Sequence, residues 1–566
     1  SSSAVHNNNN NNKRWNERVL SSRYSKNTNQ YNNNNNGLLS TILSTTATTS
    51  HNDNNDSMNN NNAIEKKQTF LIHWKGEISD GYSYDFRMAE WEGALQAIRL
   101  DNKNDKEEDP SLFEFQYKNA LSYDKEDQSL LCDKHRLYYD SSMQFVTTTT
   151  TSASEEEYLS TIIKKAVERC SLIHGIYEII TIGDSYETCN EYALKNDNFA
   201  DMYVGSNNNT SWGVRVRQYD NDKNKELSPN VNINDKIRQS RYGSRARSMK
   251  EEKKALIALT PLLSKFGGKV DLENPDCPIY LFKGLRSDKD INNTIVLARR
   301  IARGPQKISS IAPANRTCIT STPLDPMTAF SMCNIAGVKS DSYILDPFAG
   351  SCTTLLAAAM IQPDCHTVGI EITHNGIVNR SDALLDFESR NLTKPLAFIH
   401  GSAIDESIRD RARNYIRMEQ KKKEKLTTTT EKNDDNIDAC FDLIITDPPY
   451  GIREAYRTTT EDDKDNTTNS SEDDPLLSLL QCIGDDRTNG KRLLIKGGKV
   501  VTFVPSYRPR DNETLEIKDS KTFFEEECLP PIQDILPYAG LRIIDMREQV
   551  LNDILSRWLV TFVCIE

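Results

Sequence analysis

The stretch Tyr343-Ile-Leu-Asp-Pro-Phe-Ala-Gly-Ser-Cys-Thr-Thr-Leu-Leu-Ala-Ala-Ala-Met-Ile361 is the part of the chain that decides its fold. Its first four residues predict a short buried strand, and Thr353–Ile361 predicts a helix. Gly350 lies between them, where its missing side chain permits a tight turn and lets a ligand approach the backbone. A strand, a glycine-containing turn and a helix in this order form the first half of a βαβ unit.

The same alternation of strands and helices continues on both sides of this unit. Upstream, Asp325 as N-cap and Pro326 at the first helical position predict a helix over Met327–Ala336. This pattern predicts a doubly wound α/β sheet with crossover helices over residues 287–566. Downstream, we expect strands at 367–371, 396–400, 441–446, 499–504, 541–546 and 558–565, helices at 383–387 and 475–483, and solvated insertions at 421–436 and 458–474.

Residues 67–286 mix strands and helices and predict a separate α+β unit. Ser154 and Glu157 form a capping-box pattern ahead of the helical face that begins at Leu159, and a solvated stretch is expected to end in Thr147–Thr151. Residues 1–66 are dominated by Asn, Ser and Thr, which cannot bury enough apolar surface to fold, so we expect disorder there. Further strands are expected at 70–74, 177–182, 212–217, 269–272 and 279–282, and a short helix at 89–98.

The composition excludes several classes of protein. No apolar run approaches the roughly 18 residues that a membrane-spanning helix needs. The 12 cysteines are scattered, without a Cys-x-x-Cys pair, which predicts a reduced, cytoplasmic protein with no metal site. The net charge of −12 argues against general binding to nucleic acid, but residues 236–254 are locally basic. This segment is either a solvated helix face or a phosphate-binding surface carrying Arg238, Arg241, Arg245 and Arg247.

The tetrapeptide Asp447-Pro-Pro-Tyr450 follows the predicted strand Phe441–Thr446, and its two prolines cannot continue a helix or a sheet ladder. The Asp447 carboxylate and the Pro448 carbonyl can both accept hydrogens from an exocyclic amine, while Tyr450 stacks on the base that carries it. The tip of the strand therefore predicts an active site formed by Asp447, Pro448, Pro449 and Tyr450. The alternative is an ordinary turn.

Two further polar groups lie where neighbouring strands end. Gly350 precedes the N–H groups of a helix N-terminus, which favour a carboxylate. Glu371 ends the next strand, 25 residues after Asp346, at a place where a carboxylate typically accepts the ribose hydroxyls of a nucleoside cofactor. Because ligands of open α/β sheets bind beyond the carboxyl ends of the strands, we expect these groups to lie together.

Five segments of the chain carry a family resemblance. They are Tyr84-Asp-Phe-Arg-Met-Ala-Glu-Trp-Glu92, Gly268-Lys-Val-Asp-Leu-Glu-Asn-Pro-Asp276, Thr320-Ser-Thr-Pro-Leu-Asp-Pro326, Asp447-Pro-Pro-Tyr-Gly-Ile-Arg-Glu454 and Arg557-Trp558. Together they resemble the S-adenosylmethionine-dependent amino-methyltransferases, and more closely the catalytic subunit of the eukaryotic THUMP-domain tRNA (guanine(10)-N2)-methyltransferases. The likeness covers about residues 68–566.

The resemblance implies a Rossmann-like class I methyltransferase domain preceded by a ferredoxin-like and THUMP RNA-binding region. It also implies S-adenosyl-L-methionine as cofactor, tRNA as substrate and a small zinc-containing activator subunit in a heterodimer. Cys352 departs from the family pattern, which usually has a second glycine there, and Ser402 departs where an Asp commonly contacts adenine, with Asp405 as a substitute. The expected cofactor-binding residues are Asp346, Phe348, Gly350, Glu371, Ser402 and Asp447.

The expected reaction is in-line transfer of a methyl group to the N2 amine of a tRNA guanosine, in which the enzyme mainly positions a weak nucleophile. Arg453 either contacts a neighbouring phosphate or forms a structural ion pair with Glu454. Two rival functions stay open. One is a DNA adenine or cytosine amino-methyltransferase, whose target amine has the same needs. The other is a non-catalytic RNA-binding scaffold whose cofactor pocket has degenerated at Cys352 and Ser402.

Overall fold

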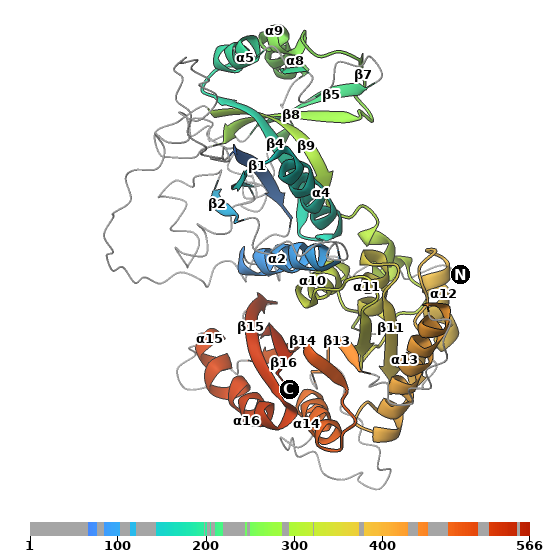
Figure 1. Ribbon diagram of the computed structural model, residues 1–566. Coiled ribbons are helices and arrows are strands. Elements are labelled where there is room, and N and C mark those ends of the chain that lie inside the picture. The colour runs from blue at the N-terminus through green and yellow to red at the C-terminus, as the bar shows by residue number, and fades with distance from the viewer. Residues whose placement is uncertain are drawn as a thin grey trace, which may run out of the picture.

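Most of the chain from Lys66 onward is described by a computed structural model. The described residues are 66–75, 84–101, 114–119, 143–196, 199–200, 204, 210–218, 244–245, 249–285, 294–320, 322–372, 378–427, 440–450, 474–507, 520–551 and 555–565. Their strands form two sheets (Figure 1). The expected disorder of the N-terminus concerns residues that lie, apart from Lys66, outside this set. No helix in the described ranges is both long and apolar enough to cross a membrane.

The first part of the N-terminal sheet has the ferredoxin-like topology that was predicted. Its strands lie in the order β2-β3-β1-β4, every neighbouring pair is antiparallel, and a helix follows β1 and another follows β3. Leu159, Ile162 and Ile163 of α4 are buried, as the predicted helical face requires. The elements are β1 (Lys66–Trp74), α2 (Tyr84–Asp101), β2 (Gln116–Asn119), β3 (Met143–Thr150), α4 (Ala153–Arg169) and β4 (Ile173–Gly183).

Two local predictions in this part were wrong. The threonine run is not solvated, because Thr147–Thr150 form the end of β3 and both Thr148 and Thr150 are buried. Threonine is β-branched and suits a pleated strand, which outweighed its polarity here. The N-cap of α4 is Ser152, whose hydroxyl accepts the backbone N–H of Glu155 at 3.2 Å, so the capping pattern begins two residues before the expected Ser154.

The sheet continues through β4 into a second group of elements. β9 pairs with both β4 and β8, so residues 294–303, which the predicted boundary at 287 assigns to the C-terminal domain, belong to the first sheet. The helices α5, α8 and α9 lie together at the far end of this sheet from the second sheet (Figure 1). The elements are α5 (Tyr186–Lys195), β5 (Ser211–Gln218), β6 (Ser244–Arg245), α8 (Met249–Ala258), α9 (Thr260–Leu263), β7 (Lys269–Val270), β8 (Cys277–Leu285) and β9 (Thr294–Arg303).

The second sheet is the predicted doubly wound one. Its strand order is β12-β11-β10-β13-β14-β16-β15; β12 to β14 run parallel, and β16 is antiparallel to both of its neighbours. The predicted bounds of the first and fourth strands hold to the residue. The strands are β10 (Tyr343–Asp346), β11 (His366–Glu371), β12 (Ala397–His400), β13 (Phe441–Thr446), β14 (Leu494–Tyr507), β15 (Leu541–Val550) and β16 (Leu555–Cys564).

Helices cover both faces of this sheet. One buried cluster joins α10, α11 and α12 to one face, and a second cluster joins α13, α14 and α16 to the other. Asp325 caps α10 as predicted, since its carboxylate accepts the N–H of Thr328 at 3.0 Å. The helices are α10 (Pro326–Ala336), α11 (Thr353–Ile361), α12 (Arg380–Glu388), α13 (Glu406–Thr427), α14 (Pro475–Thr488), α15 (Ser520–Phe523) and α16 (Leu529–Ala539).

The expected insertion at 421–436 is partly wrong. Residues 421–427 are the last turns of α13, a helix of 22 residues that the sequence reading did not anticipate. Its buried residues Ile408, Ala412 and Ile416 recur every four positions, but charged residues separate them. Residues 428–436 and 458–473 lie outside the described ranges, and Asp474 caps α14.

A buried polar seam joins the two sheets where α2 packs against α10 (Figure 1). Glu90 of α2 is fully buried and accepts the backbone N–H groups of Ser171 at 2.7 Å and Leu172 at 2.8 Å. Asn334 of α10 donates to the same carboxylate at 3.1 Å and accepts from Arg169 at 2.7 Å. The helices cross so closely that a Cβ on Gly93 would lie 2.2 Å from the Asn334 carbonyl oxygen.

Candidate active site

The polar groups predicted to form the site lie at the carboxyl ends of adjacent parallel strands. β10 ends at Asp346, and its neighbour β13 ends at Thr446, whose hydroxyl donates to Asp346 Oδ1 at 2.7 Å. Asp447 follows directly and continues into the Pro448-Pro449-Tyr450 tip. The first and fourth strands of the predicted domain thus bring residues about 100 positions apart into one place, as the rule for open α/β sheets expects.

The turn after β10 lies across the end of β11. The Ala349 N–H donates to the Ile370 carbonyl at 2.9 Å, and the Gly350 N–H donates to Glu371 Oε2 at 2.8 Å. Gly350 has a φ of 48°, in the left-handed region that favours glycine. Cys352 has a φ of 64° and is fully buried as the N-cap of α11, so the cysteine adopts the left-handed conformation that a glycine would take more easily.

Arg316 holds this turn from outside the sheet. Its guanidinium donates to the Thr353 hydroxyl at 2.7 Å and to the Ser351 carbonyl, and it pairs with Asp386 of α12 at 3.2 Å. Asp386 also accepts the backbone N–H groups of Thr317 and Cys318 at 2.9 and 3.1 Å. Because the side chains of Arg316, Asp386 and Thr353 are buried, the turn is fixed in shape by a connected polar network.

Asp346 is buried and directed into the protein. Its carboxylate accepts from the Thr446 hydroxyl, from the Phe348 N–H at 3.1 Å and from the Thr354 hydroxyl. Burial raises the pKa of Asp346 to about 6, against the lowering effect of these hydrogen bonds, and the nearby Asp447 charge adds to the rise. Asp346 therefore joins β10, β13 and α11, and Phe348 and Gly350 lie half-buried on the turn that follows it.

The turn after β12 forms the third side of the site. The Gly401 N–H donates to the Glu371 carbonyl at 3.0 Å, which places half-buried Ser402 next to the end of β11. Asp405 is exposed, and its carboxylate accepts the Ser407 N–H at 2.8 Å at the start of α13. Hydrogen bonds from the Ser407 hydroxyl and from its N–H keep the pKa of Asp405 below its ordinary value. Asp405 thus supports the first turn of α13.

The Asp447–Tyr450 tip carries an arginine partner that the sequence reading did not assign. The Tyr450 hydroxyl donates to Asp447 Oδ1, and Arg557 Nη1 of β16 donates to Asp447 Oδ2 at 3.3 Å and to the Tyr450 hydroxyl at 3.2 Å. Arg557 is itself held by Gln549, which accepts from its Nε at 2.7 Å, and by the Phe503 ring, 4.0 Å from its Cζ. The Asp447 side chain is 21% exposed, so it can be reached from outside.

This cluster can hold a neutral amine next to an ionised carboxylate. Burial and the Asp447 charge raise the pKa of the Tyr450 hydroxyl well above its ordinary value, so Tyr450 stays a hydrogen-bond donor. The positive charge of Arg557 lies 3.3 Å from the Asp447 carboxylate. Pro448 contributes a backbone carbonyl oxygen that can accept a hydrogen bond. Asp447 therefore remains a hydrogen-bond acceptor fixed between two donors.

The RNA-binding residues predicted from the sequence lie mostly outside the part of the chain that the structure describes. Arg238, Arg241, Arg247 and Arg453 lie outside the described residues, and of Arg245 only the backbone in β6 is described. Two other arginines of the first sheet make internal contacts. Arg299 pairs with Glu178 at 3.1 Å, and Arg300 donates to the Tyr280 hydroxyl at 2.7 Å.

Arg316 and Arg557 are the site residues that sequence reasoning missed. Arg557 lies in a segment with a family likeness, but its partner Asp447 is 110 positions away. Arg316 precedes another such segment, and its partner Asp386 is 70 positions away. Within the described ranges, no group of three or more His, Cys, Asp or Glu residues is arranged to hold a metal ion.

The chain is similar to known methyltransferases. Residues 313–463 match a family described as RMKL-like, methyltransferase domain. The chain is 30% identical over 306 residues to tRNA (guanine(10)-N(2))-methyltransferase TRMT11 of Xenopus laevis, which covers 52% of this chain and 57% of that protein. The corresponding human protein is 27% identical over 310 residues, 52% of this chain and 60% of the relative. The matches thus span less than two thirds of these relatives.

Among solved structures, TrmN from Thermus thermophilus aligns with a TM-score of 0.36 and 13% identity, covering 88% of this chain and all of that chain. The match to a methyltransferase family includes β10 through β13 and the Asp447–Tyr450 tip. Together with the strand order of the second sheet, it confirms the predicted Rossmann-like class I methyltransferase fold.

Proposed function

We propose that this protein transfers a methyl group from S-adenosyl-L-methionine to the exocyclic N2 amine of a guanosine in tRNA, at position 10. The observation that carries the proposal is the Asp447–Tyr450–Arg557 cluster at the end of β13, beside the turn that follows β10. The likeness to tRNA (guanine(10)-N(2))-methyltransferases supports the choice of guanosine and of the position.

The residues around the three strand ends fit S-adenosyl-L-methionine. A carboxylate at Glu371 suits the ribose hydroxyls, the half-buried Phe348 ring and Ser402 suit the adenine, and the glycine backbone at Gly350 allows close approach. Asp346 supports these groups from behind, and Asp447 borders them. When bound, the cofactor supplies a methyl group already activated on a sulfonium. The left-handed Cys352 keeps the turn in a shape that glycine also adopts, which speaks against a degenerate pocket.

The protein's own part in the reaction is to orient the amine. Asp447 accepts one amine hydrogen and the Pro448 carbonyl accepts the other, so that the nitrogen lone pair points toward the methyl group. The Tyr450 ring stacks on the guanine, a contact worth roughly 1–3 kcal/mol. Arg557 acts through Asp447. Because it donates a hydrogen bond to one oxygen of the carboxylate, it fixes the direction in which the other oxygen points.

The N-terminal sheet supplies RNA binding in this proposal. Its ferredoxin-like part and the THUMP-like elements that follow grip the tRNA, with Arg238, Arg241, Arg245 and Arg247 as phosphate contacts. Arg453, which follows the Asp447–Tyr450 tip in the catalytic half, is a further phosphate contact. A small zinc-containing activator subunit completes the enzyme in a heterodimer, and the protein acts in the cytoplasm. The phosphate contacts of the N-terminal half rest on the basic segment 236–254, and the THUMP-like region and the activator rest on the resemblance to the tRNA methyltransferases.

Asp447→Ala tests the proposal directly. The 566-residue chain, with its activator, is given tRNA and S-adenosyl-L-methionine, and N2-methylguanosine is measured by mass spectrometry of the digested RNA. We expect a loss of at least about 10²-fold in turnover, because the amine loses the acceptor that orients it. Asp545→Ala removes a carboxylate that pairs with Arg547 on β15 and serves as the control.

Near-normal turnover by Asp447→Ala would overturn the assignment of the site. Methylation of duplex DNA but not of tRNA by the wild-type chain would favour the DNA amino-methyltransferase instead. Calorimetric titration with S-adenosyl-L-methionine separates an enzyme from an RNA-binding scaffold, because a scaffold would give no binding heat.

A further inference from the structure

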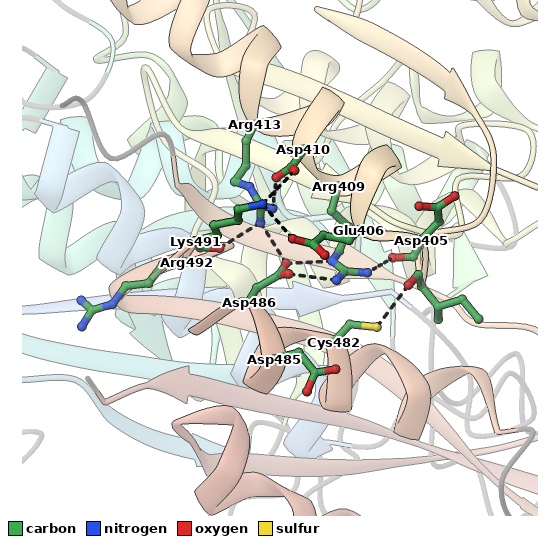
Figure 2. A network of polar contacts seen from close by, with 12 residues as sticks. Asp405, Glu406, Arg409, Asp410, Arg413, Cys482, Asp485, Asp486, Lys491 and Arg492 are labelled. Carbon is green, nitrogen blue, oxygen red and sulfur yellow. Dashed lines mark hydrogen bonds and ion pairs between the residues drawn. The ribbon is translucent and has the colours of Figure 1, made fainter. Parts of the chain in front are cut away.

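A buried charge network lies between α13 and α14, on the outer side of the second sheet. Asp486 of α14 accepts two hydrogen bonds from Arg409, at 2.7 and 2.9 Å, and a third from Arg413 at 2.8 Å. Figure 2 shows the two arginines of α13 converging on this one carboxylate. All three side chains are at most 5% exposed, so the network is shielded from solvent.

The two arginines hold different parts of the backbone. Arg409 Nη1 donates to the Ala403 carbonyl at 3.0 Å, in the turn after β12. Arg413 Nη1 donates to the Lys491 carbonyl at 2.9 Å, in the turn that leads to β14. The Cys482 thiol adds a contact of 3.6 Å to the Ile404 carbonyl (Figure 2). The turn that carries Ser402 is therefore held at two successive carbonyls, by Arg409 of α13 at Ala403 and by Cys482 of α14 at Ile404.

The hydrogen bond from Arg409 to Ala403 lies one residue away from Ser402, on the side of the sheet proposed to bind the cofactor. Ala403 is buried and directly follows Ser402, while Gly401 is bonded to the Glu371 carbonyl. Gly401 has a φ of 148°, and a Cβ there would lie 2.5 Å from Ile408 Cδ1 of α13, so the turn is packed tightly against the helix. Moving Arg409 would therefore move the backbone at Ser402.

Stability alone is a weak reason for this network. Replacing a buried ion pair by well-packed apolar residues is often neutral or stabilising, because the charges lose their hydration. A bidentate arginine–carboxylate pair fixes geometry as well as contributing energy. Arg409 uses its third nitrogen on the Ala403 carbonyl, which an apolar side chain could not hold.

We propose that Arg409 and Asp486 are positioning residues that set the turn at Ser402 for binding the adenine end of the cofactor. The proposal rests on the proposed function, since it concerns the same S-adenosyl-L-methionine site. It assigns to α13 and α14 a role in cofactor affinity, although both helices lie outside the strand ends that contact the cofactor.

The matched pair Arg409→Gln and Arg413→Gln tests this. Each variant removes one arginine from the same buried Asp486, but only Arg409 also bonds the Ser402 turn. We expect the dissociation constant of S-adenosyl-L-methionine, measured by calorimetry on the 566-residue chain, to rise about tenfold for Arg409→Gln. The KM for the cofactor should rise with it while kcat stays within about threefold. Arg413→Gln should keep the dissociation constant of the cofactor within about twofold of the wild-type value. Its thermal stability should fall by about as much as that of Arg409→Gln.

Equal cofactor affinity in the two variants would overturn the proposal. If Arg409→Gln does not fold, Arg409→Lys replaces it, because lysine keeps a charge near Asp486 but cannot also hold the Ala403 carbonyl. Wild-type affinity in a folded Arg409→Lys protein would likewise overturn it. Failure of the wild-type chain to bind S-adenosyl-L-methionine would refute the proposed function itself, which keeps the two failures distinct.

Discussion

Arg557 and Asp447 form an ion pair of 3.3 Å between the last strand of the chain and the tip of β13. The same arginine nitrogen lies 3.2 Å from the Tyr450 hydroxyl, so one guanidinium contacts both polar side chains of the tip. β16 is antiparallel to β14, and this reversed final strand brings Arg557 to the edge of the sheet at which the parallel strands end. β16 therefore contributes a residue to the candidate active site.

Replacing Arg557 by alanine should lower kcat for tRNA methylation by about 10²-fold, because a small misplacement of an orienting group has an effect of that size. Arg547→Ala is the control, since Arg547 lies on the neighbouring strand and pairs with Asp545. Steady-state kinetics on both variants check this. Equal activity in the two would show that Arg557 does not position Asp447.

Tyr450→Phe separates the hydroxyl of Tyr450 from its ring. The variant loses the hydrogen bond to Asp447 but keeps the stacking surface. We expect kcat to fall by about tenfold, which corresponds to one hydrogen bond, while KM for tRNA stays near the wild-type value. Tyr450→Ala should weaken both parameters, since it also loses about 1–3 kcal/mol of stacking. A Tyr450→Phe enzyme as slow as Tyr450→Ala would contradict this division.

Asp346 predicts a pH dependence of stability. Its pKa is about 6 in the folded protein and 3.8 as an ordinary carboxyl, so between these values the folded state holds a proton that the unfolded state has lost. This group's contribution to the free energy of unfolding is therefore largest below pH 4 and declines as the pH rises through 6. Between pH 5 and pH 7 the decline is about 1 kcal/mol.

Asp346→Asn, which cannot titrate, should lack this decline whatever its absolute stability. Urea unfolding of wild type and variant at both pH values measures the difference in slope. Parallel pH profiles would show that Asp346 titrates as it does in the unfolded chain.

The backbone conformation of Cys352 predicts an unusual ranking of variants by thermal stability. Its left-handed backbone costs an L-residue roughly 1–2 kcal/mol, which glycine avoids. Cys352→Gly should therefore stay within about 1 kcal/mol of wild type, although it loses a buried thiol. Cys352→Val should be destabilised by about 2 kcal/mol or more, because a β-branched residue fits this conformation badly. Thermal unfolding ranks the variants, and a valine variant more stable than glycine would contradict the expectation.

Much of the catalytic sheet could be predicted because its signals are local. The strands at Tyr343–Asp346 and Phe441–Thr446 are short apolar runs, and Asp325-Pro326 is a helix start that needs no tertiary contact. α13 was missed because its apolar positions are few and lie among charged residues, two of which, Arg409 and Arg413, turn inward to Asp486. Charged residues that point inward give a helix packed against the sheet the sequence pattern of a solvent-exposed helix.

The strand-end residues of the candidate site could be placed from the sequence, but the residues that support them could not. Asp346 and Glu371 each end a recognisable strand, and Asp447 directly follows one. Arg316 and Arg557 act on groups 35 to 110 positions away, and nothing near them in the chain indicates their partners. The boundary between the sheets was also hidden, because β9 reads as an ordinary strand until its pairing with β4 is known.

The seam at Glu90 has a consequence for how the chain acquires its structure. Ser171 and Leu172, which satisfy part of the buried carboxylate, are synthesised with the first sheet, but Ser331 and Asn334 come more than 150 residues later. Until α10 has been synthesised, the face of α2 that it covers stays exposed to water. The N-terminal half therefore completes its packing only after the part of the C-terminal half that holds α10 has been made. Folding of the two halves is thus coupled, because the N-terminal half is synthesised before its packing partner. Unfolding of either half would break the hydrogen bond between Asn334 and the Glu90 carboxylate.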